Sequence, residues 1–344
     1  MKRLSVIFAL LLGASQVFGQ EQGFKNVQIL KDLTPAQLFT EMDLMEASLG
    51  VGCDYCHVAK GNETDFASDA KSEKKTGREM IQLVLDTNQK FFNKRPVVTC
   101  NTCHRGSTNP VGLVSLPQAM PPFPTPERKR PILPTRDEIV AKYEAAVGKI
   151  DKNALASLSM KGIREGSDGK KTDIEVWQKD GNVRGSTADM TEVVTPNGGW
   201  LSTKQEGTKA MSAEQHEASV EHARDLRFVT PEDVPADARV VRTDKIEGHE
   251  VYVVQSSIAP KVRQRLYFDT ESGLLVRRTL LTSTLLGDVP TQVDYSDYRD
   301  AGGFKLPYTM KLDLIAPWNN STRHYTEIHP NAKVDEKTFE MPKP

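Results

Sequence analysis

The sequence predicts an α+β protein of two domains, a mainly α N-terminal domain followed by an antiparallel β half-barrel-like domain with helices. A chain of 344 residues is too long for one small core and suits two domains of ordinary size. All four cysteines precede a proline-rich segment at 111–134, and nearly all of the strand-like sequence follows it. Such a segment is typical of a stiff, extended linker, so it marks the expected boundary between the domains.

The first residues have the pattern of a secretory signal peptide. A basic start at Met1–Arg3 precedes an apolar stretch from Val6 to Leu12, and small residues follow up to Gly19. This stretch is shorter than the roughly 20 residues that a membrane-spanning helix needs. We therefore expect residues 1–19 to be cleaved and the mature protein to be exported to the periplasm, without a transmembrane span and either soluble or peripheral to the membrane.

Two helices are expected in the first domain, residues 20–110. Thr34 to Gln37 forms a capping box with proline at the first helical position. One apolar face then follows and stops near Gly50: Leu38, Met42, Met45 and Leu49. A second helix is expected to begin near Ser68-Asp69, with one stripe of Met80, Val84, Thr87 and Phe91. Each helix precedes one cysteine motif, which indicates a weak internal duplication.

The second domain, residues 135–344, is expected to begin with a helix at 136–148 and to continue as an antiparallel meander. Alternating segments separated by turn residues predict its strands, among them 174–177, 251–254 and 264–268. One further helix is expected at 212–227, capped by Ser212 with Gln215 three residues later. A curved sheet with helices on one face is the simplest closed arrangement of these elements.

Both cysteine pairs have the attachment pattern of c-type haem, CxxCH. The two motifs are Cys53-Asp54-Tyr55-Cys56-His57 and Cys100-Asn101-Thr102-Cys103-His104. Thiols at this spacing can reach the two vinyl groups on one edge of a porphyrin, and the next residue then lies under the ring, where its imidazole can bind iron. The sequence therefore predicts two covalently bound haems c, with His57 and His104 as axial ligands.

The cysteines allow three other interpretations. A zinc site built from two CxxC pairs explains the cysteines but not the histidine after each pair. A disulfide framework suits an exported protein, although CxxC loops are usually redox-active. A thioredoxin-like motif would place one CxxC at a strand-to-helix turn. The haem interpretation uses all four cysteines and both histidines.

The sixth iron ligand can be narrowed by elimination. Before the linker the only histidines are His57 and His104, so methionine is the available ligand. The candidates are Met42, Met45, Met80 and Met120. The first three lie on the expected buried faces of the two helices, where methionine is ordinarily a filler of the core. Because these cores must enclose haem, we expect at least one methionine of each helix to face iron.

Five segments of the first domain follow a pattern found in a known family: Asn26–Leu30, Leu49–His57, Phe66–Asp69, Arg78–Met80 and Val98–Gly106. Through these segments, residues 24–110 resemble the cytochrome c subunit of photosynthetic reaction centres. The resemblance implies a methionine ligand on the helix before each motif, which assigns Met80 to the second haem and Met42 to the first, with Met45 as the alternative. The photosynthetic subunit carries four such motifs, whereas this chain has two followed by a β-rich domain.

A weaker resemblance is carried by two segments of the C-terminal region, Tyr267–Arg277 and Gly302–Pro307. Through them this region resembles periplasmic lipoprotein carriers of the LolA type, whose incomplete barrel holds acyl chains on its concave face. It implies a possible hydrophobic ligand or, alternatively, a scaffold that positions the haems or a partner. The remaining histidines lack ligand spacing and are expected to be ordinary surface or packing residues: His216, His222, His249, His324 and His329.

These observations favour a periplasmic electron carrier that turns over no substrate. Its expected partner is a redox protein, including a membrane-bound electron-transfer complex. With 45 basic against 46 acidic residues, charge gives no reason to expect a nucleic acid. Two alternatives stay open: a peroxidase-like dihaem enzyme, in which one iron is open, and a redox-sensing protein that binds lipid or another hydrophobic ligand.

Overall fold

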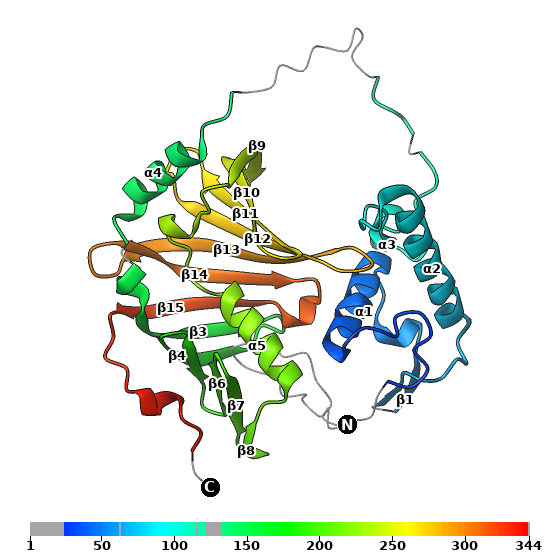
Figure 1. Ribbon diagram of the computed structural model, residues 1–344, viewed down its shortest axis with the longest axis horizontal. Helices are drawn as coiled ribbons and strands as arrows, with labels where there is room; N and C mark the ends of the chain where they lie inside the picture. Colours follow the sequence, from blue (N-terminus) through cyan, green and yellow to red (C-terminus); the bar gives the residue numbers. More distant parts are fainter. Residues whose placement is uncertain (1–23, 62, 115, 121–131, 151, 343–344) are drawn as a thin grey trace. The chain divides into compact units, whose positions relative to one another are not determined.

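The computed structural model describes most of the chain. The described residues are 24–61, 63–114, 116–120, 132–150 and 152–342. They form two compact units (Figure 1): a helical unit, Gln22–Pro134 with Thr282–Val289, and a β-rich unit, Thr135–Leu281 with Pro290–Pro344. The expected signal peptide and residues 121–131 of the expected linker lie outside the described residues. None of the described helices is both long and apolar enough to span a membrane.

The helical unit contains two long helices and several short elements. Its elements are α1 (Pro35–Leu49), a 3-10 helix (Cys53–Tyr55), β1 (Val58–Lys60), β2 (Glu63–Asp65), α2 (Ser72–Phe92) and α3 (Cys100–Cys103). The start of α1 is confirmed, because Thr34 and Gln37 form the reciprocal capping box. Its end is confirmed at Gly50, whose φ of 67° is left-handed.

The beginning of α2 differs from the sequence prediction. The helix starts at Ser72 rather than near Ser68-Asp69. The Asp65 carboxylate accepts the amides of Ala67 and Ser68, and the ammonium of Lys74 donates to carbonyls in the same loop. Side chains therefore satisfy backbone groups that a longer helix would otherwise have paired. The β1–β2 hairpin just before this loop was not predicted.

A segment distant in sequence completes the helical unit. The carboxylate of Glu41, which is 1% exposed, accepts hydrogen bonds from the amide of Leu285 at 2.9 Å and the hydroxyl of Thr284 at 3.1 Å. Leu286 is fully buried. Burial raises the pKa of Glu41, and these hydrogen bonds oppose that rise.

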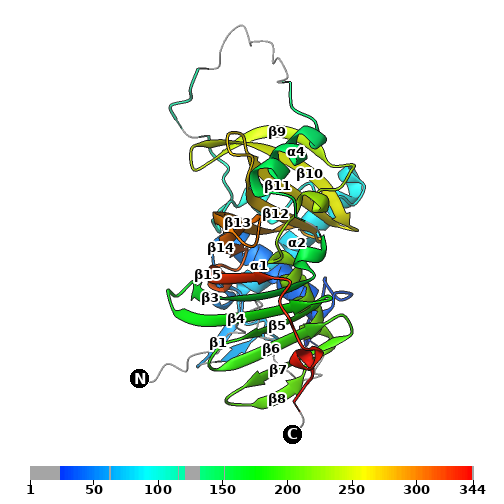
Figure 2. The ribbon, with the colours of Figure 1, turned by 90° about the vertical axis from the view of Figure 1, so that its left-hand side faces the viewer.

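The β-rich unit is one antiparallel meander with two helices (Figure 2). Its helices are α4 (Arg136–Val147) and α5 (Ala213–Asp225), and 3-10 helices occur at Lys152–Leu155, Pro231–Asp233, Pro317–Asn319 and Glu336–Phe339. Its strands are β3 (Ser157–Gly166), β4 (Lys171–Lys179), β5 (Asn182–Ser186), β6 (Met190–Thr195), β7 (Gly198–Thr203), β8 (Gly207–Ala210), β9 (Arg239–Ile246), β10 (His249–Ala259), β11 (Val262–Asp269), β12 (Leu275–Ser283), β13 (Asp288–Asp300), β14 (Lys305–Leu314) and β15 (Ser321–Pro330). The predicted helix at 136–148, the Ser212–Gln215 cap and the three predicted strand segments are confirmed.

The sheet has 13 strands, and each neighbour in space is a neighbour in sequence except where β3 pairs with β15. That pairing joins the two ends of the meander, with Ser321 opposite Gly166 and Pro330 opposite Leu158. The main core lies between one face of this sheet and α4, whose Ile139, Tyr143 and Val147 pack against buried strand residues. The unit thus buries an apolar core of its own.

Candidate haem sites

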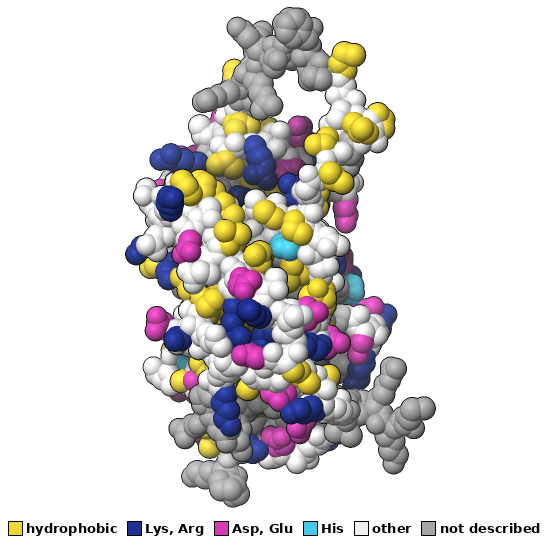
Figure 3. Space-filling model, turned by 90° about the vertical axis from the view of Figure 1, so that its right-hand side faces the viewer, with side chains coloured by type: hydrophobic (Ala, Val, Ile, Leu, Met, Phe, Trp, Pro, Cys, Tyr) yellow, Lys and Arg dark blue, Asp and Glu magenta, His cyan; other side chains and the backbone are white. Residues whose placement is uncertain are grey.

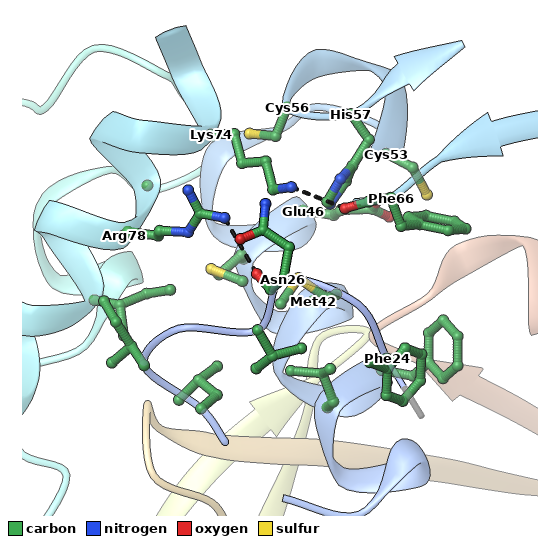
Figure 4. Close-up of a pocket in the computed structure, with 18 of the residues that line it drawn as sticks. Phe24, Asn26, Met42, Glu46, Cys53, Cys56, His57, Phe66, Lys74 and Arg78 are labelled. Carbon is green, nitrogen blue, oxygen red and sulfur yellow. Dashed lines mark hydrogen bonds between the residues drawn. The ribbon is translucent and has the colours of Figure 1, made fainter. Parts of the chain in front are cut away.

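The first cysteine motif opens onto a cavity between α1, α2 and the segment that precedes α1. The cavity has a volume of about 220 Å³ and is lined by Cys53, Cys56 and His57. Met42 and Met45 of α1 also line it. Figure 4 shows Met42 and His57 at this cavity with Asn26, Lys74 and Arg78. One motif and two methionines therefore surround the same space.

The second motif opens onto a second cavity, of about 430 Å³. Cys100, Cys103 and His104 line it together with Met80 of α2 and Met45 of α1. Met80 is 41% exposed and contributes to the cavity wall, whereas Ile81 and Val84 are the apolar residues that α2 buries. Phe91, predicted on the buried stripe, is 66% exposed, so that part of the prediction is wrong.

Both histidines present an imidazole suited to binding a metal. Nδ1 of His104 lies 2.9 Å from the carbonyl oxygen of Ser107. A carbonyl only accepts, so Nδ1 carries the proton and Nε2 keeps its lone pair for a ligand. Burial lowers the pKa of His57, and the neighbouring charges of Lys74 and Arg78 lower it further. A lowered pKa favours the neutral form, which is the form that ligates iron.

The surroundings of three of the four cysteines disfavour the thiolate form. All four, each within the described residues, are unpaired. Burial and Glu46 raise the pKa of Cys53 to about 12, and burial also raises the pKa of Cys56 and Cys100. Reactive thiols and zinc ligands need a thiolate, which these surroundings disfavour. In the part of the chain that the structure describes, no three His, Cys, Asp or Glu side chains gather as a metal site.

A charged network closes one side of the first cavity. Oδ1 of Asp69 lies 2.9 Å from Nη2 of Arg78, 3.1 Å from Nζ of Lys74 and 2.9 Å from Nδ2 of Asn26. Arg78 also donates to the carbonyl of Asn26, one of the hydrogen bonds drawn in Figure 4. These contacts hold the pKa of Asp69 well below its usual range, and the hydrogen bond from Arg78 has the largest effect. They fix the segment 24–30, which lines the cavity, to α2 and its preceding loop.

The helical unit has the features expected of a unit that packs around large groups. Among its described residues, the buried apolar side chains are Leu30, Leu38, Leu44, Ile81, Val84, Leu286 and Val289. Hydrophobic side chains are also visible on its surface (Figure 3), and the exposed ones include Tyr55, Phe66, Met80, Leu83 and Phe91. This apolar core is small for a unit of such length. Two cavities, each lined by a CxxCH motif, fit two haems c.

The structure brings nearly all of the predicted site residues together. Met42 lines the first cavity, Met80 lines the second, and Met45 lines both. Met120 lines neither and is 92% exposed. The sequence reasoning gave no role to Lys74 or Gly77, which also line these cavities. For Lys74, its position one turn before Arg78 on the expected helix was the available signal.

Comparison with known proteins agrees with this arrangement. Residues 14–120 match the family model described as photosynthetic reaction centre cytochrome C subunit. The N-terminal region of this chain is similar to that family. The resemblance seen in its cysteine motifs is thereby confirmed, and the match does not extend into the β-rich unit.

Curated relatives of this cytochrome-like region include two bacterial proteins. Cytochrome c-554 of Chloroflexus aurantiacus is 40% identical over 90 residues, covering 24% of this chain and 21% of the relative. The photosynthetic reaction center cytochrome c subunit of Thermochromatium tepidum is 41% identical over 92 residues, covering 26% of this chain and 21% of the relative. The chain thus spans about a fifth of the length of these relatives.

Solved structures similar to the chain include two proteins of low sequence identity. A DUF1329 family protein from Desulfovibrio piger has a TM-score of 0.40 and 10% identity, covering 60% of this chain and 95% of its own. A LolA superfamily protein from Nitrosomonas europaea has a TM-score of 0.38 and 12% identity, covering 60% of this chain and 98% of its own.

Proposed function

We propose that this chain is a periplasmic c-type cytochrome that carries two covalently bound haems and transfers electrons. The observation that carries the proposal is the pair of cavities in the helical unit, each lined by one CxxCH motif and by methionine. Haem c supplies a one-electron couple between ferrous and ferric iron. The family match at residues 14–120 supports the same function.

The chain's own residues attach, ligate and shield the two groups. Cys53 and Cys56 anchor the first haem and His57 binds its iron, while Cys100, Cys103 and His104 do the same for the second. Met42 and Met80 are the proposed sixth ligands, because each lines the cavity of one motif only. Methionine opposite histidine raises the reduction potential relative to two histidines. A carrier of this kind accepts electrons from donors whose reduction potential is that of a quinol or higher.

The proposed partner is a membrane-bound redox complex on the periplasmic side, as the family resemblance implies. The alternative is a protein that binds a hydrophobic ligand in its β-rich unit. A cavity below α5 has a volume of only about 20 Å³, and its lining includes the polar side chains of Gln178, Glu192 and Arg323. Such a space is too small and too polar for an acyl chain.

The test is a spectroscopic redox titration of full-length protein matured in a host that assembles c-type cytochromes. We expect two haems per chain, two one-electron transitions, and methionine-to-iron charge-transfer absorbance in the oxidised form. Met42→Ala and Met80→Ala should each remove about half of that absorbance, with exposed Met120→Ala as the matched control. Met45→Leu, which keeps the volume, decides between Met45 and Met42. A five-coordinate high-spin signal in the unmodified protein would instead support a peroxidase-like enzyme.

A further inference from the structure

The two haem cavities share one wall. Five residues line both cavities: Met45, Leu49, Cys56, Gly77 and Ile81. They come from α1, from the first motif and from α2. Cys56, an attachment point of the first haem in the proposed function, therefore also borders the second cavity. The shared wall is the place where groups bound in the two cavities come closest.

Gly77 is the unexpected member of this wall. It lies within α2, six residues from its first residue Ser72 when both are counted, and glycine is unfavourable in a helix interior relative to alanine. Its backbone is helical, so a left-handed conformation does not explain the glycine. Apart from the two chain neighbours and the helix's own nearby backbone, no heavy atom of the described residues lies within 4 Å of the Cβ that an alanine would add. The protein's own packing therefore gives no reason for a missing side chain here.

We propose that Gly77 is a positioning residue that leaves room for the two haems to approach each other across this wall. The inference rests on the proposed function. Gly77 lies three residues before Met80, on the same face of α2, and that face lines the second cavity. Haems held in the two cavities would exchange one electron across this wall, one iron being oxidised and the other reduced. No atom or proton is transferred in this step.

The experiment compares interhaem coupling in haem-loaded, full-length variants. Gly77→Leu fills the shared wall, and Lys75→Leu is the matched control, because Lys75 is exposed on the same helix and lines neither cavity. The readout is the two-signed Soret circular dichroism couplet, which depends on the separation and orientation of two haems and not on folding alone. We expect Gly77→Leu to reduce its amplitude at least twofold, while Lys75→Leu leaves it unchanged.

The outcomes separate this inference from the proposed function. Fewer than two covalent haems in the unmodified protein would overturn the proposed function before Gly77 is tested. Two haems without a couplet, or an undiminished couplet in Gly77→Leu, would overturn the role of Gly77 alone. If Gly77→Leu does not load both haems, Gly77→Ala decides, because its methyl group faces open space in the described structure. A reduced couplet in Gly77→Ala supports the proposal and an unchanged one overturns it.

Discussion

Nη2 of Arg78 lies 2.9 Å from Oδ1 of Asp69, and the same oxygen lies 3.1 Å from Nζ of Lys74. One carboxylate thus compensates two cations that line the first cavity. The side chains of Lys74 and Arg78 are only 10% and 17% exposed, whereas that of Asp69 is 48% exposed. The two cations of the network therefore lie shielded on α2, whereas the carboxylate of Asp69 is in contact with solvent.

Asp69→Asn tests this network. The substitution keeps an oxygen acceptor but removes a negative charge, so Lys74 and Arg78 lose their compensation near His57. Added positive potential favours ferrous iron, and we expect the midpoint potential of the first haem to rise by on the order of tens of millivolts, reduced by solvent screening. Redox titration measures the change. Asp86→Asn, an exposed acid on α2 that lines neither cavity, should shift neither potential appreciably.

Preventing haem attachment should loosen the helical unit and spare the β-rich unit. The helical unit buries few apolar side chains without its haems, while the β-rich unit buries an extensive core around Tyr143 and Phe268. We expect a Cys53→Ser, Cys56→Ser, Cys100→Ser, Cys103→Ser variant to be cleaved rapidly by protease within residues 24–120. All three tryptophans, Trp177, Trp200 and Trp318, lie in the β-rich unit and report its unfolding. Equal protease resistance with and without haem would show that the helical unit does not need its haems to complete its core.

Local rules predicted those elements whose signals lie within a few residues. The capping boxes at Thr34 and Ser212 fixed the starts of α1 and α5, and Gly50 fixed the end of α1. The CxxCH spacing likewise grouped each cysteine pair with its histidine, and each group lines one cavity. Strand segments in the meander followed from alternation and turn residues.

Features that depend on distant partners could not be predicted in this way. The predicted start of α2 was wrong because Asp65 and Lys74 form hydrogen bonds with the backbone of the loop before the helix. Met42 and Met45 could not be distinguished by their place on one helical face, since the packing of α2 decides that Met45 lines both cavities. The contact of Glu41 with Leu285 joins residues 244 apart in sequence, and no local pattern encodes it.

Gly162→Ala should strongly destabilise the β-rich unit. Gly162 lies on β3 where the register with β15 shifts at Tyr325, and an added Cβ would lie 2.2 Å from the His324 carbonyl oxygen. The three nearest atoms are all backbone atoms of His324 and Tyr325, so no flexible side chain can move aside, and we expect a loss of about 3 kcal/mol in the free energy of unfolding. Denaturant unfolding followed by tryptophan fluorescence measures it. Lys161→Ala, exposed on the same strand, should change stability by less than about 1 kcal/mol.

The stability of the β-rich unit should fall as the pH rises toward neutrality because of Glu192. This residue of β6 is 2% exposed, and one carboxylate oxygen accepts from Ser219 at 2.7 Å. Its Oε2 has no hydrogen-bond partner among the described residues, and burial raises the pKa of Glu192 from 4.5 to about 7. Between these two pKa values the folded state holds a proton that the unfolded state has lost. Raising the pH through this window therefore favours unfolding.

Glu192→Gln should remove this pH dependence. The amide keeps an oxygen that accepts from Ser219 but carries no charge to desolvate, so at pH 8 the variant should be more stable than the unmodified protein by up to about 3 kcal/mol. At pH 4 the two should differ little, because both side chains are then neutral. Tryptophan-detected denaturant unfolding across this pH range measures the difference, with partly exposed Glu175→Gln as the control. A variant that loses stability with pH as steeply as the unmodified protein would show that Glu192 is ionised in the folded state, with Arg323 compensating its charge.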